Sequence, residues 1–211
     1  MKHPKSFEYY YSNRMGRMLL VSGEEILGRP GMVAVLKSMP TGQNYLESYP
    51  PANSRLEFPF EMVSELYPAM VSKYGLQGGR GLLMRTGRAC FQHGLREFGP
   101  LFGLTDLAFR LLPLKTKLKV GAKTFADIFN KHSDQRVRIE DAEKSLFWII
   151  ERCPVCWGRT SDRPSCDLAA GLLQEALFWV SGGKVFPVEE THCHAAGDAD
   201  CVFVINKAPM V

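Results

Sequence analysis

The placement of the cysteines constrains this chain more than any other feature of its sequence. Five of the six cysteines lie in the 49 residues from Cys153 to Cys201. Cys153 and Cys156 form a Cys-Pro-Val-Cys knuckle, while Cys193 and Cys201 flank a seven-residue connection around Gly197. A hairpin centred on Gly197 would place Cys193 and Cys201 across from each other on one face, close enough to share a metal ion.

The amino-terminal stretch bears on whether these cysteines are reduced. Met1 to Leu20 mixes charged residues with tyrosines and lacks the apolar core of a signal peptide. The longest apolar runs, residues 146–150 and 176–180, are far shorter than the roughly 20 residues that cross a bilayer. We therefore expect a cytoplasmic protein with no membrane span, whose cysteines are thiols or metal ligands rather than a disulfide frame. Buried free cysteines and a Cys193 to Cys201 disulfide are the alternatives.

The carboxyl-terminal third resembles a known domain family. The segment from Cys153 to Ile205 carries Cys-Pro-Val-Cys-Trp-Gly, then Cys166 with Gly171, then Glu-x-x-Cys followed by seven residues and a further cysteine. This pattern is similar to the 4-vinyl reductase domain family, whose members include aromatic-sensing input domains of bacterial transcription activators and hydrocarbon-binding proteins. The resemblance implies helices packed on an antiparallel sheet, usually in a homodimer, around a hydrophobic ligand pocket. It also implies a structural zinc ion bound by Cys166, Glu190, Cys193 and Cys201.

Glu190 is the member of this set that strand geometry disfavours. It lies three residues before Cys193 and would point to the opposite face of a regular strand. It can join the site only if the strand bulges or ends there. The spacing from Cys166 to Glu190 is slightly longer than in the aromatic sensors, which leaves Glu189 as a substitute ligand.

Zinc is the metal that this donor set favours. Thiolates are soft ligands, and three sulfurs with one carboxylate complete a tetrahedron without an open position for water, as in structural sites. Cys153 and Cys156 could instead supply the remaining ligands. An iron–sulfur cluster is the alternative cofactor, because sequence alone does not separate zinc from iron when sulfur dominates. His192 and His194 are alternative ligands or exposed hairpin residues.

Hydrophobic periodicity predicts an α+β fold in a single domain, residues 1–211, with a mainly helical part at 1–134 and a strand-rich metal-binding part at 135–211. The resemblance implies the arrangement of trafficking-complex subunits, with helices on a sheet of about four antiparallel strands. Helices are expected at Pro30 to Met39, Phe58 to Tyr74, Gly81 to Phe98, Leu114 to Asn130 and Pro164 to Trp179. Strands are expected at Arg17 to Ser22, residues 135–140, Ser145 to Glu151, Lys184 to Cys193 and Cys201 to Lys207. Gly87 and Gly94 share a helix face, which predicts close packing there.

Enzyme activity and nucleic-acid binding find little support in the sequence. The net charge of +4 comes from 26 basic and 22 acidic residues, too even a balance to indicate a nucleic-acid partner. Gly78-Gly-Arg-Gly81 lacks the preceding strand of a dinucleotide site, and no serine lies in a Gly-x-Ser-x-Gly elbow. We therefore assign no catalytic residue and favour a binding domain over an enzyme.

Aromatic residues on expected inward faces are the candidates for a ligand pocket. The proposed ligand-binding residues are Trp148, Phe91, His93, Phe125, Phe129 and Phe178. Trp148 is preferred because it lies in a strand just before the metal motif, where the resembling sensors place a ligand-contacting tryptophan. Lys115, Lys119 and Lys123 form a stripe that is either a solvated helix face or a binding surface for the carboxylates of a tetrapyrrole or fatty acid.

These observations predict a zinc-stabilised binding domain for a hydrophobic small molecule, namely an aromatic, hydrocarbon, lipid or tetrapyrrole, acting as carrier or sensor. Homodimerisation is expected. The alternative is an enzyme or accessory factor of (bacterio)chlorophyll or tetrapyrrole metabolism, such as vinyl reduction. A scaffold of the trafficking type without a ligand is a third possibility.

Overall fold

The computed structural model describes residues 8–100 and 107–210. Residues 1–7, 101–106 and 211 of the expected 1–211 domain therefore lie outside the described residues, as does the start of the Met1 to Leu20 stretch. The helices are α1 (Asn13–Lys37), α2 (Phe60–Ser64), α3 (Leu66–Phe98), α4 (Leu107–Leu111), α5 (Leu114–His132) and α6 (Asp167–Ser181). The strands are β1 (Tyr10–Ser12), β2 (Leu56–Pro59), β3 (Arg136–Asp141), β4 (Ser145–Arg152), β5 (Val188–His192) and β6 (Cys201–Asn206), with 3-10 turns at Gly42–Tyr45 and His194–Ala196.

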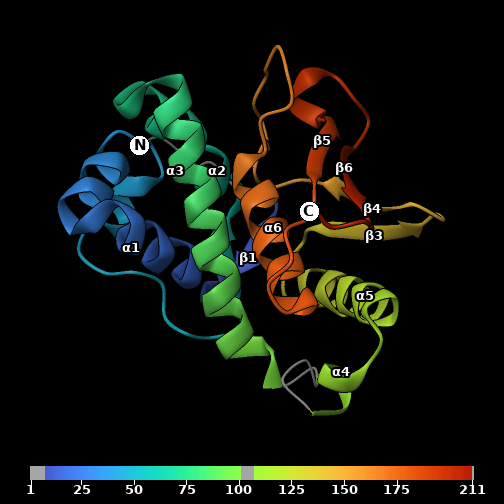
Figure 1. Cartoon of the computed structure of the whole chain (residues 1–211). Coiled ribbons are helices and arrows are strands. Elements are labelled where there is room, and N and C mark those ends of the chain that lie inside the picture. The colour runs from blue at the N-terminus through green and yellow to red at the C-terminus, as the bar shows by residue number, and fades with distance from the viewer. Residues whose placement is uncertain (1–7, 101–106, 211) are drawn as a thin grey trace.

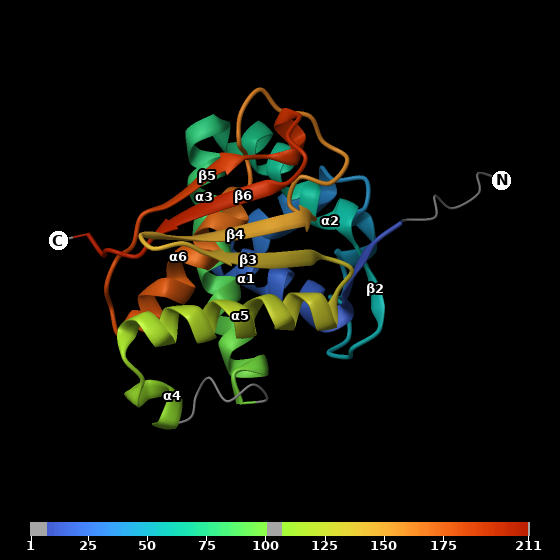
Figure 2. The ribbon, with the colours of Figure 1, turned by 90° about the vertical axis from the view of Figure 1, so that its right-hand side faces the viewer.

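The main sheet has four antiparallel strands in the order β3-β4-β6-β5, which confirms the predicted α+β class (Figure 2). Residues alternate across it: Leu146, Trp148 and Ile150 of β4 are buried against the helices, while Arg138 and Glu140 of β3 are exposed. A second, two-stranded sheet pairs β1 with β2.

Helices cover one face of the main sheet in layers. Figure 1 shows α6 between the sheet and α3, with α1 on the far side of α3. Figure 2 shows α5 running alongside β3. Helix α5 presents Leu118, Ala126 and Phe129 to the interior, and its lysines Lys115, Lys119 and Lys123 are exposed. The arrangement leaves α3, α5, α6 and the sheet facing one shared apolar interior.

Two glycines set the close contact between α3 and α6. A Cβ on Gly87 would lie 2.0 Å from the carbonyl oxygen of Leu168, and one on Gly171 would lie 2.0 Å from that of Met84. Only glycine allows the two backbones this approach. The close packing predicted for Gly87 is confirmed. Gly94, by contrast, has only the end of the Met18 side chain at 3.9 Å, so the same prediction for Gly94 was wrong.

The first third of the chain departs most from expectation. The strand predicted at Arg17 to Ser22 was wrong, because these residues lie inside α1, where Leu19 and Leu20 join the core. Gly28, with φ of 69°, kinks α1, and Pro30 follows in the first turn of its second half. The expected helix from Phe58 to Tyr74 is split into β2, α2 and the start of α3.

Gly75 bends the chain but does not end a helix. Its φ of 74° interrupts α3, yet the helix resumes and continues to Phe98. The other predicted helices and strands after residue 80 agree with the structure to within a few residues at their ends. Among the helices of residues 8–100 and 107–210, none combines the length and apolar character needed to cross a bilayer.

Candidate metal centre and apolar cavity

Five cysteines from four separate segments meet at one end of the main sheet. Cys153 and Cys156 belong to the turn after β4, Cys166 caps the amino terminus of α6, Cys193 follows β5 and Cys201 begins β6. All five side chains are between 0% and 3% exposed. The fold thus concentrates thiols at a point where a helix and three strand ends have to be held together.

The distances between the sulfur atoms fit metal ligands better than disulfides. The Cys166 Sγ lies 3.8 Å from those of Cys153 and Cys193 and 3.9 Å from that of Cys201, and the Sγ atoms of Cys156 and Cys201 are 3.4 Å apart. A tetrahedral zinc site with Zn–S bonds of about 2.3 Å requires sulfurs about 3.8 Å apart, whereas a disulfide bond is about 2.05 Å. All five thiols are free, so the Cys193 to Cys201 disulfide alternative was wrong.

Glu190 reaches the cysteines through a bulge in β5. Glu190 pairs with Phe203 and His192 pairs with Val202, so Thr191 is an extra residue in β5. A bulge here is the irregularity that strand geometry requires if Glu190 is to lie on the same side as the cysteines. Its Oε2 accepts a hydrogen bond of 2.8 Å from the backbone N–H of Cys166. The neighbouring Glu189 is exposed and belongs to no group of possible metal donors among the described residues, which favours Glu190.

The other oxygen of Glu190 makes no hydrogen bond. Its Oε1 is buried without a hydrogen-bond partner. Burial raises the pKa of this carboxyl to about 8, and contacts with neighbouring thiols, Cys153 first, raise the pKa of Cys166 above its ordinary value. A buried carboxylate oxygen without a partner is costly unless a cation lies beside it. The donor set therefore fits a metal ion.

Two overlapping groups of four donors could hold a metal ion. In each group all the donor atoms lie within 4.8 Å of one another. One group consists of Cys153, Cys156, Cys166 and Cys201, and the other of Cys166, Glu190, Cys193 and Cys201. The four ligands implied by the family resemblance thus lie together, and the Cys-Pro-Val-Cys knuckle supplies a second set.

Hydrogen bonds around the centre fix its ligands in place. The backbone N–H of Cys193 donates to Asp198 across 2.7 Å, and that of His194 donates to the Cys201 sulfur across 3.3 Å. Gly197, with φ of 101°, makes the turn between them. His192 and His194 are both exposed. They lie outside both donor groups, which favours the interpretation of these histidines as surface residues.

An ion pair anchors the same helix end to α3. Asp167, 6% exposed, follows Cys166 in the first turn of α6 and accepts three hydrogen bonds of 3.0 to 3.1 Å from Arg80. Bidentate pairing of this kind fixes geometry as well as charge. The cysteine cluster and this ion pair thus both hold the first turn of α6.

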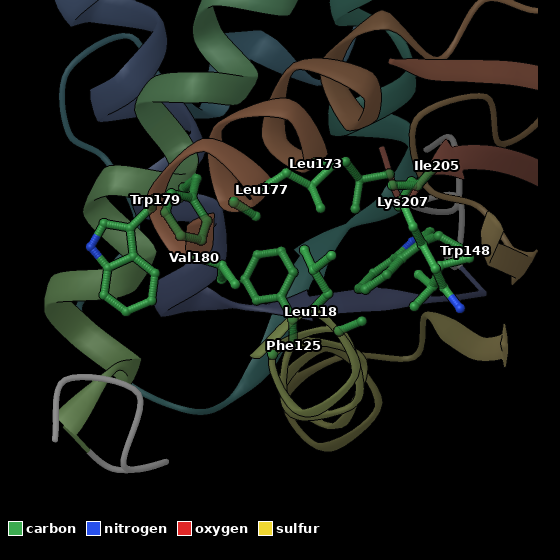
Figure 3. A pocket seen from close by; sticks show the side chains of 14 residues that line it. Leu118, Phe125, Trp148, Leu173, Leu177, Trp179, Val180, Ile205 and Lys207 are labelled. Atoms are coloured by element: carbon green, nitrogen blue, oxygen red, sulfur yellow. The ribbon is translucent and has the colours of Figure 1, made fainter. Parts of the chain in front are cut away.

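An apolar cavity lies further along α6, between that helix, α5 and the sheet (Figure 3). Its volume is about 40 Å³. Figure 3 shows Leu118 and Phe125 of α5 facing Leu173, Leu177 and Val180 of α6, with Trp148 of β4 and Ile205 of β6 at one end. All of these side chains are apolar, so a ligand here would be recognised mainly by shape and burial.

Two further cavities adjoin the first. One of about 70 Å³ lies towards α1, and its wall includes Met15, Met18, Cys90 and Leu95. The other, of about 40 Å³, lies towards the cysteines and includes Tyr11, Ile150 and Val155. The first cavity shares Phe91 and Phe125 with the second, and Trp148 and Leu173 with the third.

Packed aromatic rings separate these cavities. The ring centroids of Phe91 and Phe125 are 5.5 Å apart, those of Phe125 and Trp148 are 5.7 Å apart, and those of Phe129 and Trp148 are 6.1 Å apart. Rotation of one ring about its side-chain bonds would join two of the spaces. The side chains of these aromatic residues therefore divide the apolar interior into separate small cavities.

The structure places four of the six proposed pocket residues on these cavities, namely Phe91, Phe125, Trp148 and Phe129. His93 instead pairs with Glu25, with 2.9 Å between Nε2 and Oε2. Phe178 is 44% exposed, so its expected inward orientation was wrong. It follows Leu177, and the inward face of α6 passes through Leu173, Leu177 and Val180.

One charged side chain reaches the first cavity. Lys207 lies on its wall, after β6, and its ammonium group pairs with Asp141 at 2.5 Å and donates to the carbonyl oxygen of Ala142 (Figure 3). Lys119, 71% exposed, lies 3.4 Å from the same carboxylate. Sequence reasoning missed Lys207, although its position two residues after the inward-facing Ile205 was a sufficient signal.

A family model matches the segment that carries the cysteines. The model of the 4-vinyl reductase domain matches residues 146–207, the stretch from β4 to just past β6 that carries the five cysteines. The resemblance of the cysteine pattern to this family is thereby confirmed. No curated protein matches the chain at a significant level.

Several solved structures share the fold at low sequence identity. The phenol-responsive sensory domain of the transcription activator PoxR, solved with phenol, is 18% identical with a TM-score of 0.52, over 72% of this chain and 76% of that one. An Fe(II) unliganded H-NOX protein from K. algicida is 12% identical with a TM-score of 0.53, over 92% and 95%. The trafficking protein particle complex subunit 3 from Naegleria fowleri, covalently bound to palmitic acid, is 14% identical with a TM-score of 0.52, over 70% and 93%.

Proposed function

We propose that this chain is a metal-stabilised binding domain for a small apolar molecule, which it senses or carries. The observation that supports the proposal most is the path of α6. The helix begins at the cysteine centre with Cys166 and then supplies Leu173, Leu177 and Val180 to the first cavity. A ligand that displaced these side chains would act on a helix whose other end is fixed.

The cavity volumes favour a ligand of one ring or a hydrocarbon chain. Taken together the three spaces approach the roughly 150 Å³ of an engineered cavity that binds benzene. Rotation of Phe125 or Phe91 would merge two of them at modest cost, because exchange between staggered side-chain conformations is easy where space is available. A tetrapyrrole would require α5 and α6 to move apart, so we rank that ligand and its metabolism as the alternative.

Lys207 provides a polar end for such a ligand. Its ammonium group lies at the cavity wall beside Asp141. A phenol or a carboxylate could accept a hydrogen bond there while its apolar part entered between Leu118 and Leu177. The exposed lysines of α5 remain, on this proposal, a surface that attracts anionic molecules before binding.

The relatives support an apolar ligand. A fold shared with a domain solved with phenol and a subunit solved with palmitic acid is compatible with an interior that opens around different apolar molecules. Cys90 of the second cavity is this chain's candidate for a covalent link, but burial raises the pKa of its thiol to about 12, which disfavours the reactive thiolate. We therefore propose non-covalent binding.

Zinc is our proposal for the metal. Cys166, Glu190, Cys193 and Cys201 would hold it as a closed four-ligand site, with the partnerless Glu190 Oε1 as the carboxylate donor. Bound zinc would supply structural stability and no reaction. A homodimer, expected from the family, would be tested by light scattering of the purified chain.

Titration calorimetry with toluene and decanoate tests the binding proposal. Ala122→Trp should abolish saturable binding, because Ala122 lines the cavity and the added ring would fill it. Val120→Trp is the matched control, since Val120 is 40% exposed on the same helix and this variant should bind as the wild type does. Equal binding by both variants would contradict the assigned cavity. A saturable shift of the visible absorption band of added haem or chlorin would favour the tetrapyrrole alternative.

A further inference from the structure

The cysteine centre contains more donors than one metal ion can use. A tetrahedral ion takes four ligands, but five thiols and one carboxylate meet here. We propose that the centre binds two metal ions, with Cys166 and Cys201 as thiolate bridges between them. This inference rests on the metal centre proposed above and adds a second ion to it.

The two donor groups have the composition that a bridged pair requires. They share Cys166 and Cys201 and differ in their other two members. Cys153 and Cys156 complete one group, and Glu190 and Cys193 complete the other. Each ion would then have two bridging and two terminal ligands, so that two tetrahedra share one edge.

The sulfur positions agree with this shared edge. The Sγ atoms of Cys166 and Cys201 are 3.9 Å apart, close to the edge of about 3.8 Å that a zinc tetrahedron has. From this edge, Cys153 lies 3.8 Å from Cys166, and Cys156 lies 3.4 Å from Cys201. In the second group, Cys193 lies 3.8 Å from Cys166. Cys153, Cys156 and Cys193 are therefore each at ligand spacing from one of these two sulfurs, and the Glu190 carboxylate lies within 4.8 Å of both.

A single ion would leave buried donors without a role in either arrangement. If the four cysteines of the first group bound a single ion, the buried Oε1 of Glu190 would still have no hydrogen-bond partner and no metal ion beside it. If the second group bound that ion, Cys153 and Cys156 would remain as buried thiols that bind no metal, although they are only 3% and 0% exposed. Two ions use all six donors.

Two ions leave no more net charge buried than one. Each thiol that becomes a ligand loses its proton to solvent, and the carboxyl group does the same. A single divalent ion with four ionised donors and two divalent ions that share six ionised donors leave the same residual negative charge, because thiols outside the ligand set stay protonated. The backbone N–H of His194, 3.3 Å from the Cys201 sulfur, adds a hydrogen bond to one bridge. The second ion would tie the turn after β4 to the start of α6.

Native mass spectrometry of the full chain, reconstituted with zinc and compared with elemental analysis, would count the ions. We expect two zinc ions per chain. The double variants Cys153→Ser/Cys156→Ser and Glu190→Gln/Cys193→Ser should each retain one ion, because each removes only one terminal pair. Cys90→Ser is the matched control, since Cys90 lies outside the centre and this variant should retain two.

Cadmium-113 NMR of the wild-type chain gives a second measurement that does not depend on variants that fold. Two ions bridged by thiolates should give two resonances coupled to each other. One ion per chain, unchanged in Cys153→Ser/Cys156→Ser, would overturn the second ion but leave the single proposed site. No bound ion would overturn both. Acid-labile sulfide with a visible absorption band would also overturn the inference, because inorganic sulfide would then be the bridge.

Discussion

The backbone N–H of Cys166 donates a hydrogen bond of 2.8 Å to Oε2 of Glu190. Through this contact one side chain of β5 satisfies a donor at the start of α6, and its other oxygen is left beside the thiols. Glu190 therefore links the start of α6 to the cysteine cluster, because its carboxylate both caps the helix and lies beside the thiols. The stability of α6 should therefore depend on the metal.

Removal of the metal should lower the stability of the domain. At a free zinc concentration 1,000 times the dissociation constant, binding adds about 4 kcal/mol, which for a chain of this size corresponds to a shift in Tm of about 10 °C. Calorimetry of the zinc-loaded protein before and after addition of a chelator would measure this shift. An unchanged Tm would show that the cysteine centre does not hold the fold together.

The contact between α3 and α6 should not tolerate a methyl group. Gly171→Ala places a Cβ 2.0 Å from the carbonyl oxygen of Met84, so the helices must separate, at a cost of about 1–3 kcal/mol. Gly81→Ala is the matched control within α3, because no atom lies within 4 Å of its added Cβ. Urea unfolding of both variants would compare them. Equal stabilities would contradict the close packing.

Cys90 should resist alkylation in the folded protein. Burial raises its pKa to about 12 from 9.0, so at pH 8 its thiolate fraction falls by about 1,000-fold. Iodoacetamide labelling followed by mass spectrometry, with the other cysteines metal-bound, would measure the rate against that of the urea-unfolded chain. Rapid labelling of the native protein would indicate an accessible thiolate.

The same pKa shift has a consequence for stability. Because the folded state raises the pKa, protonated Cys90 contributes stability that is fully present below about pH 9 and is lost as the pH rises toward 12. The Cys90→Ala variant should therefore lose stability less steeply than the wild type as the pH rises from about 9 to about 12. Denaturant unfolding at several pH values would test the sign. An identical pH dependence in both proteins would contradict the shift.

Lys207 should distinguish a carboxylate ligand from a neutral one. Lys207→Met should weaken decanoate binding by about tenfold, since a hydrogen bond to a charged group contributes about 1.5–3 kcal/mol before the loss of the Asp141 pair is counted. Binding of decanol should change little. Lys115→Met, on an exposed position of α5, is the matched control. Equal losses for decanoate and decanol would show that Lys207 acts only through packing.

The carboxyl-terminal half could be predicted closely because its signals are local. The alternation in β3, the Phe, Trp and Ile content of β4, the Gly182 that ends α6 in the left-handed region, and the turn at Gly197 each specify their own element. The resemblance supplied the proposed ligand set, and strand geometry correctly required a bulge beside Glu190. In this half of the chain, signals within each segment were sufficient to predict its structure.

The amino-terminal half resisted prediction because its structure depends on distant contacts. Arg17 to Ser22 has the pattern of a short apolar strand, but burial of Leu19 and Leu20 against the rest of the core favours a helix. A glycine such as Gly75 is typical of a helix end. Periodicity cannot show that α3 resumes after the kink, so the helix was predicted to stop there. For the pocket, the aromatic residues were chosen because they lay on expected inward faces, and the exposure of Phe178 shows that the inward face of α6 was misassigned at that position.

On the proposed function, the interior between α5, α6 and the sheet binds an apolar molecule. Methyl NMR of the zinc-loaded protein during titration with toluene would detect this binding residue by residue. We predict saturable shifts of the methyl groups of Leu118, Leu173, Leu177 and Val180, with none at the exposed Leu76 and Val185. Shifts that fail to saturate, or that are equal at the exposed and the cavity methyl groups, would contradict the claim.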